Sequence, residues 1–257
     1  MRNPSHDPRV EIEAANPWYV ADQFATQCGA QASRAVLENR WRVFARAIDE
    51  WVGSTGRLPA FAMDAGCGDG INLSFLTRLC AERGWPTRLV GADYSALRIG
   101  RARRFESCCL ARTSLTSLGF ADASFDIVLC NQVLEHIPDD DAAFREIHRV
   151  LRPSGLCVIG VPNEGSMLGT LRNHVLQRSV LRSTDHVNMY TEQILRRRMS
   201  QANLRVERVL PEGFFVPHTA VHAALNGLRP VRQVLNAIAR AVPPLAAGLI
   251  VVATRRL

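Results

Sequence analysis

The segment that most restricts the fold of this chain is a short apolar strand followed directly by a glycine-rich turn. Residues 60–64 have the pattern of a strand, Asp64-Ala65-Gly66-Cys67-Gly68-Asp69-Gly70 form the turn, and residues 71–83 are typical of a helix. Glycines lack side chains, so such a turn can be tight and a ligand can approach its backbone closely. Ligands of open α/β sheets bind beyond the carboxyl ends of the strands. The sequence therefore predicts an α/β fold with a ligand site at this turn.

The alternation of strand and helix continues along the chain. Further apolar or alternating segments predict strands at 88–92, 125–130, 156–161, 204–210 and 247–254. Helical patterns cover 16–51, 95–105 with Ser95 as its cap, 139–151, 191–202 and 214–242, and a turn at 152–155 ends the third of these. Strands separated by helix-length segments favour a mostly parallel sheet with helices on both faces.

The chemistry of the turn argues against a dinucleotide. Its spacing is G-x-G-x-G rather than the G-x-G-x-x-G that cradles a pyrophosphate, and Asp64 just before the glycines would repel a phosphate but suit a cation. Asp93 ends the next strand, where a carboxylate can accept hydrogen bonds from both ribose hydroxyls. The alternative is an aspartate that only caps the following helix, and we favour the ribose role because the glycine turn accompanies it.

Several motifs in one order carry a family resemblance. They are the segments 63–70, 91–95, 124–130, 133–138 (Val-Leu-Glu-His-Ile-Pro), 149–155 and 161–163. With these the chain resembles the class I S-adenosylmethionine-dependent methyltransferases, particularly the small-molecule group that includes ubiquinone-biosynthesis-type O-methyltransferases. The resemblance implies a Rossmann-like seven-stranded sheet with N-terminal helices and a helical lid. It divides the chain into an N-terminal helical cap, 1–55, and a cofactor-binding core, 56–257, with helical insertions at about 164–190 and 214–243.

The resemblance also implies cofactor contacts at the first two strands. The turn from Ala65 through Gly66, Cys67 and Gly68 to Gly70 is expected to hold the methionine part of S-adenosylmethionine, with Asp64 near its ammonium group. Asp93 is expected to hold the ribose, and Tyr94 to lie against the adenine.

Further contacts are implied at residues 114–115 and directly after the strand predicted at 125–130. Asn131 and Gln132 are expected to flank the methionine end, and the backbone of Leu115 to lie near the adenine edge. The chain departs from the family at Ser114, where an acidic residue usually accepts a bond from the adenine amino group. A serine oxygen can accept the same bond without charge assistance, so we expect weaker binding.

Two histidines are candidate bases. His136 follows the fourth strand, and His186 stands beside Asp185, which could orient its ring. Imidazole suits proton transfer near neutral pH, although His136 equally fits a role in shaping the wall of the site. Seven cysteines show no metal-ligand spacing, so no metal is expected.

Charge and hydropathy bear on partners and location. The net charge is +7 and all 31 basic residues are arginine, which leaves an electropositive surface. No apolar run is long enough to cross a membrane and no secretion signal is evident, so we expect a cytoplasmic protein. The insertions mix apolar residues with arginines: we favour a lid, with peripheral contact at the inner face of a membrane as the alternative.

These observations predict a methyltransferase that acts at an oxygen of a small-molecule or lipid-like acceptor. An RNA or protein methyltransferase is an alternative that the positive charge supports, but no RNA-binding module is evident, so nucleic acid is not expected. A non-catalytic partner with the same fold is the other alternative, because of Ser114 and the absence of an obvious base. The oligomeric state is left open.

Overall fold

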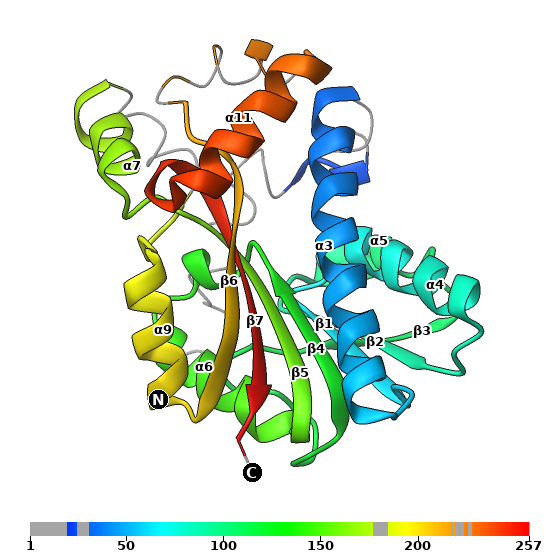
Figure 1. Ribbon diagram of the computed structural model, residues 1–257. Coiled ribbons are helices and arrows are strands. Elements are labelled where there is room, and N and C mark those ends of the chain that lie inside the picture. The colour runs from blue at the N-terminus through cyan, green and yellow to red at the C-terminus, as the bar shows by residue number, and fades with distance from the viewer. Residues whose placement is uncertain are drawn as a thin grey trace.

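The computed structural model describes residues 20–24, 31–176, 185–216, 218, 221, 224–225 and 228–256. Its centre is a seven-stranded sheet in the order β3-β2-β1-β4-β5-β7-β6 (Figure 1). The strands are β1 Phe61–Ala65, β2 Arg88–Asp93, β3 Cys108–Arg112, β4 Phe125–Asn131, β5 Leu151–Pro162, β6 Leu204–Phe214 and β7 Ala246–Arg255. β1 to β5 are parallel, and β7 runs antiparallel to both β5 and β6. The prediction of a Rossmann-like, seven-stranded, mostly parallel sheet is confirmed.

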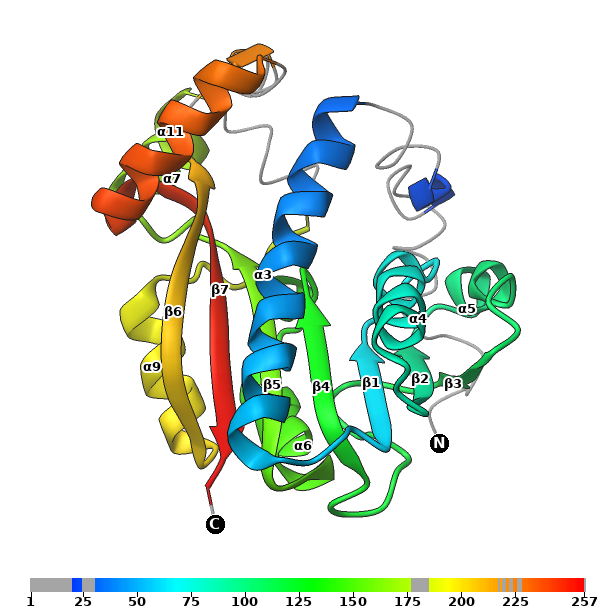
Figure 2. The same cartoon turned by 45° about the vertical axis from the view of Figure 1, so that its right-hand side comes forward.

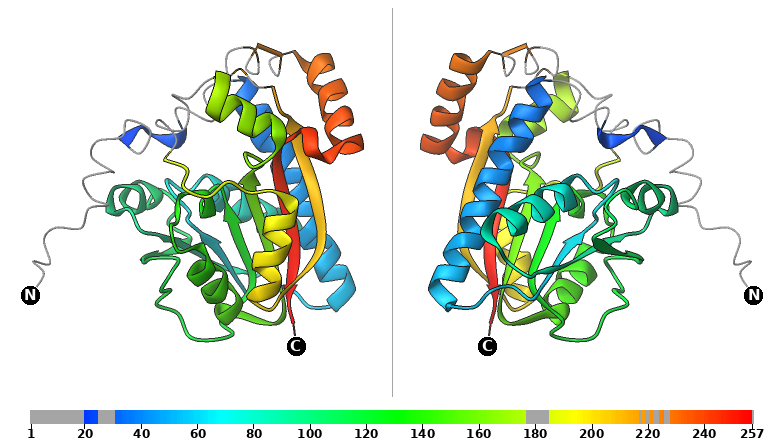
Figure 3. Two further views of the ribbon diagram at one scale, coloured as in Figure 1. Left: turned by 90° about the vertical axis from the view of Figure 1, so that its left-hand side faces the viewer. Right: turned by 90° about the vertical axis from the view of Figure 1, so that its right-hand side faces the viewer.

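Helices cover both faces of the sheet. The longer ones are α3 Gln31–Thr55, α4 Ile71–Arg83, α5 Ala96–Ala102, α6 Asp140–Val150, α9 Glu192–Gln201 and α11 Arg229–Ala241. α3 and α4 pack on one face and α6 and α9 on the other, as the two edge-on views show (Figure 3). Consecutive residues of β1 alternate between the faces, since Ala62 packs with α3 and α4 while Met63 packs with the opposite core.

The first described long helix, α3, is anchored by aromatic residues on its buried side. Trp41 stacks on Phe75 of α4 with ring centroids 5.6 Å apart, and its indole N–H donates to Asn72 Oδ1 at 3.2 Å. Phe44 is fully buried in the same cluster. The three- and four-residue spacing of apolar residues in the sequence therefore marks the face that packs on the sheet. Within the predicted helix 16–51, residues 20–24 and 31–51 are described, and α3 covers the second of these ranges. The division of the chain at residue 55 stays a prediction.

Two elements differ from the sequence-based expectations. The strand β3 was not located in the sequence, because its residues are half-buried or exposed at the edge of the sheet and its apolar run, Cys108 to Ala111, is short. The predicted turn at 152–155 lies inside β5 as an irregularity, where the pairing partner of β4 jumps from Leu151 to Leu156. Ser154 takes a left-handed φ of 61° there, so the chain bulges without leaving the sheet.

Both predicted insertions lie at the end of the sheet where the parallel strands terminate. The first contains α7 Met167–Leu171 and η3 Arg172–Leu176, and the second contains α11. Figure 2 shows α7 and α11 together above the ends of β6 and β7. The helix predicted over 214–242 is shorter in the structure: β6 extends to Phe214 and α11 begins at Arg229. Residues 177–184 of the first insertion lie outside the described residues.

Candidate functional site

A cavity of about 1070 Å³ opens at the carboxyl ends of β1, β2 and β4. Ten of the residues expected to bind cofactor or act as bases line it, namely Gly66, Cys67, Asp93, Tyr94, Ser114, Leu115, Asn131, Gln132, His136 and His186. The other four, Asp64, Ala65, Gly68 and Gly70, are not among its lining residues. The tertiary structure thus brings together side chains that are more than 100 positions apart in the sequence.

The glycine turn is shaped by close packing as well as by ligand access. Gly66 has a φ of 80°, and a Cβ placed on it would lie 2.3 Å from Val133 Cγ2. Gly70, with a φ of 93°, would meet the ring of Phe105 at 2.6 Å and stands just before α4. A side chain at either position would collide with a neighbour as well as strain the backbone. In this structure Gly70 is therefore a packing residue.

Asp93 is held between the turn and the next helix. Its Oδ2 accepts from the Gly68 N–H at 2.8 Å and its Oδ1 accepts from the Ser95 N–H at 2.8 Å. Burial raises the pKa of Asp93, and these two hydrogen bonds offset only part of that rise. Each carboxylate oxygen keeps further lone-pair capacity on the cavity wall, so the side chain is placed to accept from a vicinal diol.

Asp64 lies behind the cavity wall, fully buried in β1. Burial raises its pKa to about 8, the charge of Asp93 adds to the rise, and Asn72 opposes it. Neither carboxylate oxygen has a hydrogen-bond partner of normal geometry among the described residues. Its expected role beside an ammonium group stays a prediction, since it does not face the cavity directly.

The side of the cavity expected to take adenine is formed by the ends of β2 and β3. The guanidinium of Arg112 lies over the Tyr94 ring, 5.8 Å from its centroid. Ser114 Oγ and Thr116 Oγ1 are 2.8 Å apart, so the hydroxyl of Ser114 is already engaged in the turn that follows β3. Leu115 is buried against the core between them. Ser114 can still accept a bond from a ligand, because a hydroxyl oxygen has two lone pairs.

The loop after β4 forms the wall between the two sides. Gln132 has a left-handed φ of 57° and its N–H donates to Gly160 O at 2.7 Å, which turns the chain sharply at the end of the strand. The neighbouring Asn131 is nearly buried, and its Oδ1 has no hydrogen-bond partner among the described residues. A backbone strained in this way at a cavity is a common feature of functional sites.

The two candidate bases, His136 and His186, both line the cavity and lie next to each other. The rings of His136 and His186 are 4.8 Å apart in an edge-to-face arrangement. His186 Nδ1 lies 2.7 Å from Glu164 Oε2, so Glu164 supplies the carboxylate in contact with this ring, and the expected role of Asp185 in orienting an imidazole stays a prediction. Glu135, His136 and His186 bring potential ligand atoms within 4.8 Å of one another, and the expected absence of a metal stays a prediction.

Comparison with known proteins decides the family. A family model described as a methyltransferase domain matches residues 63–159, which run from β1 through the glycine turn into β5. The chain carries a class I S-adenosylmethionine-dependent methyltransferase domain.

Relatives of this methyltransferase domain agree with the match. A probable S-adenosylmethionine-dependent methyltransferase of Mycobacterium tuberculosis is 33% identical over 102 residues, which are 39% of this chain and 35% of that protein. A ubiquinone biosynthesis O-methyltransferase of Pseudomonas paraeruginosa is 30% identical over 120 residues, 45% of this chain and 49% of that protein. The chain thus spans about half or less of the length of these two relatives.

The solved structures agree at the level of the fold. A putative methyltransferase from Haloferax volcanii, solved in complex with the Trm112 methyltransferase activator, superposes with a TM-score of 0.59 at 17% identity. The superposition covers 92% of this chain and 99% of that one. An identity this low shows a shared fold and nothing further about the acceptor.

Three charged residues of the methyltransferase site were not found from the sequence. Arg40 of α3 and Arg98 of α5 line the cavity, and Glu164 lies just after β5 with only 4% exposure. Arg40 and Arg98 sit in ordinary helical patterns, where nothing distinguishes a cavity residue from a solvated one. Glu164 follows the motif at 161–163 directly, and its position after a strand end was the one available signal.

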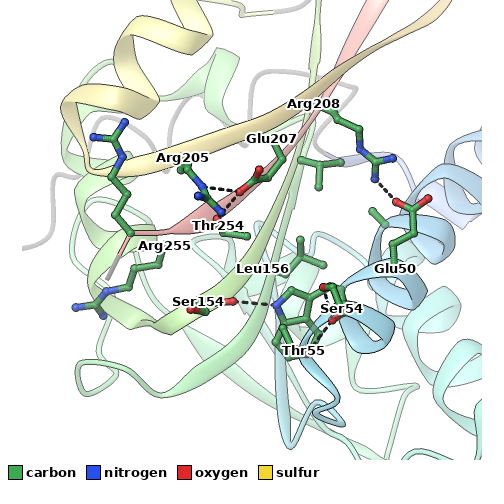
Figure 4. Close-up of a pocket in the computed structure, with 14 residues that line it drawn as sticks. Glu50, Ser54, Thr55, Ser154, Leu156, Arg205, Glu207, Arg208, Thr254 and Arg255 are labelled. Carbon is green, nitrogen blue, oxygen red and sulfur yellow. Dashed lines mark hydrogen bonds and ion pairs between the residues drawn. The ribbon is translucent and has the colours of Figure 1, made fainter.

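A second hollow lies at the opposite end of the sheet from the methyltransferase site (Figure 4). Its charged side chains already pair with other protein groups: Arg208 with Glu50, and Arg205 at 2.7 Å with Glu207. The Trp51 indole N–H donates to Ser154 O at 2.9 Å in its floor. Since parallel sheets bind ligands at the other end, this hollow is not the candidate site.

Proposed function

We propose that this protein transfers the methyl group of S-adenosylmethionine to an oxygen atom of a small-molecule or lipid-like acceptor. The observation that carries the proposal is that Asp93 and His186 line one and the same cavity. Its volume of about 1070 Å³ is at the upper end of the range for ligand sites, which suits a cofactor and an acceptor held together.

Within this proposal Asp93 holds the ribose, Tyr94 and Leu115 contact the adenine, and the turn at Gly66 and Cys67 contacts the methionine part. When bound, the cofactor supplies an electrophilic methyl group. The protein then has to orient an acceptor towards that methyl group and exclude water, because positioning supplies much of the rate of a displacement reaction. We assign the acceptor side to the residues around His186 and to α3, which contributes Leu37 and Arg40 to the wall.

Two observations support an oxygen acceptor. One relative is named as an O-methyltransferase. A histidine with a carboxylate partner lies on the cavity wall, and a hydroxyl acceptor benefits from such a base.

Calorimetric titration with S-adenosylmethionine and S-adenosylhomocysteine tests the proposal. We expect the parent protein to bind both, and Asp93→Ala to lose at least tenfold in affinity because two ribose hydrogen bonds and the anchor of the turn are lost together. Glu106→Ala is the matched control, since Glu106 is an exposed acidic residue between α5 and β3.

The outcomes of this titration separate the alternatives. A folded parent protein that binds neither compound would contradict the proposal and favour a non-catalytic partner with this fold. Binding of both compounds, with equal affinity in Asp93→Ala, would place the cofactor elsewhere in the cavity.

We also propose that the insertions bring the protein to an anionic membrane surface, where a lipid-like acceptor would be found. Within the structure's described part, no helix has the length and apolarity needed to span a bilayer. Yet Met167, Val175, Val234 and Val242 expose 81%, 64%, 60% and 43% of their surface at the carboxyl end of the sheet. Exposed apolar side chains of this kind mark contact surfaces when they gather beside basic residues.

The sequence of the same segments supports an anionic partner. Residues 165–184 and 213–257 contain no aspartate or glutamate, whereas α11 alone carries Arg229, Arg232 and Arg240. Basic residues beside an anionic leaflet each add about 1 kcal/mol of attraction.

A further inference from the structure

The ring of His186 is held by a network of buried charged groups that the methyltransferase motifs do not include. His186 Nδ1 lies 2.7 Å from Glu164 Oε2, and both side chains are largely buried, at 12% and 4% exposure. Glu164 follows the end of β5, whereas His186 belongs to the segment 185–190 that leads to α9. Because Nδ1 is engaged with the carboxylate and the ring lines the cavity, Nε2 is the nitrogen left for a bound acceptor.

A second group fixes the carboxylate itself. The guanidinium of Arg172, in η3, binds Glu164 Oε1 and also receives support from Asn173 Oδ1 at 2.8 Å. The same guanidinium lies over the ring of Phe215, 4.9 Å from its centroid. Glu164 therefore connects the first insertion, the end of β6 and the ring of His186 in one contact chain.

The charges around the two histidines differ. Burial, together with the neighbouring His186, lowers the pKa of His136 to about 4, so a proton on His136 is strongly disfavoured. Burial alone would raise the pKa of Glu164, but His186 and Arg172 outweigh it and hold that pKa below its usual value. The carboxylate of Glu164 lies 2.7 Å from the His186 ring, so the two histidines stand in different electrostatic surroundings.

Other titratable groups surround the pair. Glu135, in the short helix η2 Leu134–His136, has a carboxylate oxygen within 4.8 Å of a ring nitrogen of each histidine, and burial raises its pKa to about 7. Asp185 precedes His186 in the chain, and Arg98 of α5 faces His136. Among these, Glu164 is the acidic group in direct hydrogen-bond contact with the His186 ring.

We propose that His186 is the general base of the methyl transfer, that Glu164 and Arg172 are its positioning residues, and that the acceptor is therefore a group that loses a proton, a phenol or an alcohol. This inference rests on the proposed methyltransferase function. The acceptor O–H bond breaks as its proton moves to Nε2 of His186, and the oxygen electron pair forms the new bond to the methyl carbon. The carbon–sulfur bond breaks with its electron pair left on sulfur, and the imidazolium later releases the proton to water.

The network also explains why the base stands on an insertion. Nδ1–H donated to Glu164 fixes the tautomer that leaves the Nε2 lone pair towards the cavity. Arg172 holds Glu164 in place from η3, so the arrangement of the first insertion decides whether the base is aligned. A tertiary amine or a thioether has no proton to give, and we expect such acceptors to gain nothing from this network.

The direct test is the tautomer of His186, measured by nitrogen-15 NMR on the histidine-labelled full chain with S-adenosylhomocysteine bound. We expect neutral His186 to carry its proton on Nδ1, with a strongly downfield proton signal that disappears in Glu164→Gln. His136→Asn and His186→Asn assign the two rings. A proton on Nε2 in the parent would overturn the proposal, because that nitrogen could not then accept one.

A kinetic test uses the radiolabelled methyl group of S-adenosylmethionine with catechol as a phenolic probe. We expect His186→Asn to lower kcat at least 100-fold with an unchanged KM for S-adenosylmethionine, as is typical for loss of a general base. Glu164→Gln is expected to change the shape of the pH–rate profile as well as its height, because the charged carboxylate in contact with the His186 ring is removed. His148→Asn, on α6 and away from the cavity, is the matched control.

The outcomes distinguish this inference from the proposed function. Intact binding of S-adenosylmethionine together with a full kcat in His186→Asn would overturn only the assignment of the base. An equal effect of Glu164→Gln at all pH values would mean that Glu164 is structural, and would overturn its positioning role. Loss of S-adenosylmethionine binding in the parent would instead contradict the proposed function.

Discussion

Asp64 and Asp93 end neighbouring strands and show how one carboxylate is buried with partners and the other without them. Asp93 accepts two backbone hydrogen bonds, each 2.8 Å long, which hold the turn and the next helix in register. Asp64 has no such bonds, and burial raises its pKa to about 8. The two side chains hold similar positions on neighbouring strands but serve different physical roles, since Asp93 organises the backbone and Asp64 is a buried carboxyl that favours its neutral form.

The raised pKa of Asp64 predicts a pH-dependent stability. The unfolded chain ionises this carboxyl near its ordinary value of 3.8, whereas the folded chain retains the proton up to about pH 8. Between these values the folded state binds more protons, so the free energy of unfolding falls as pH rises, by up to about 1.4 kcal/mol per pH unit. Asp64→Asn should remove this part of the fall, which urea unfolding at pH 5 to 9 would measure.

The control for this prediction is Glu106→Gln, at an exposed acidic position. Its stability curve should run parallel to that of the parent. If the free energy of unfolding changes with pH in the same way in Asp64→Asn and in the parent, the Asp64 carboxyl is ionised in the folded protein across this range.

At the scale of elements, a buried ion pair joins α3 to β6. Arg40 Nε lies 2.7 Å from Glu212 Oε1 and Nη2 lies 2.6 Å from Oε2, and the side chains are only 13% and 8% exposed. The two residues are 172 positions apart, so this contact spans most of the chain. It fixes the end of α3 that borders the cavity against the strand that leads towards α11.

Removing one partner of this pair should cost more than the pair contributes. We expect Arg40→Met to lower the free energy of unfolding by about 3–5 kcal/mol, because Glu212 would be left buried without a counter-charge. The double variant Arg40→Met/Glu212→Leu should recover most of that loss. Urea unfolding of the two single variants and the double variant gives the coupling energy.

An exposed pair on the same helix is the control. Arg34 and Glu38 lie 3.1 Å apart with side chains 68% and 43% exposed, so Arg34→Met should cost less than about 1 kcal/mol. A loss in Arg40→Met as small as that in Arg34→Met would mean that water reaches Glu212.

At the scale of the whole molecule, the two ends of the sheet differ in character. At the end where the parallel strands begin, Arg208 and Arg205 of the hollow in Figure 4 pair with Glu50 and Glu207. At the other end lie the cavity and two segments of the insertions, 165–184 and 214–243, that contain no acidic residue. The net charge of +7 is therefore unevenly distributed, with exposed apolar and basic side chains gathered at the end of the sheet where the cavity opens.

This asymmetry predicts binding to anionic vesicles. We expect the protein to co-sediment with phosphatidylglycerol vesicles at low salt, to bind less as salt screens the arginines, and not to bind neutral phosphatidylcholine vesicles. Val234→Asp should lower the bound fraction several-fold, because it places a charge in the exposed apolar face of α11.

The control substitution lies at the other end of the sheet. Leu58 is 53% exposed just before β1, and Leu58→Asp should bind vesicles as the parent does. An equal loss in both variants would mean that net charge alone controls binding. No binding of the parent at low salt would leave the insertions as a lid over the cavity.

The sequence alone determined the fold class, the cofactor family and ten of the residues that line the cavity. These features depend on local patterns, since a strand, a turn and a helix are encoded by neighbouring residues, and the motifs keep their order along the chain. The packing role of Gly70 could not be seen there, because Phe105 meets it only in the folded chain. Nor could β3, whose half-buried residues resemble a surface segment until β2 pairs with them.

Only the tertiary structure decided which carboxylate accompanies His186. The sequence offered Asp185 because it is adjacent to His186, whereas the carboxylate in contact with the ring belongs to Glu164, 22 positions away. Glu164 reaches the ring because β5 ends beside the segment that contains His186, and Arg172 fixes it from the insertion between them. Such contacts depend on where strands end in space, and no local pattern in the chain records that distance.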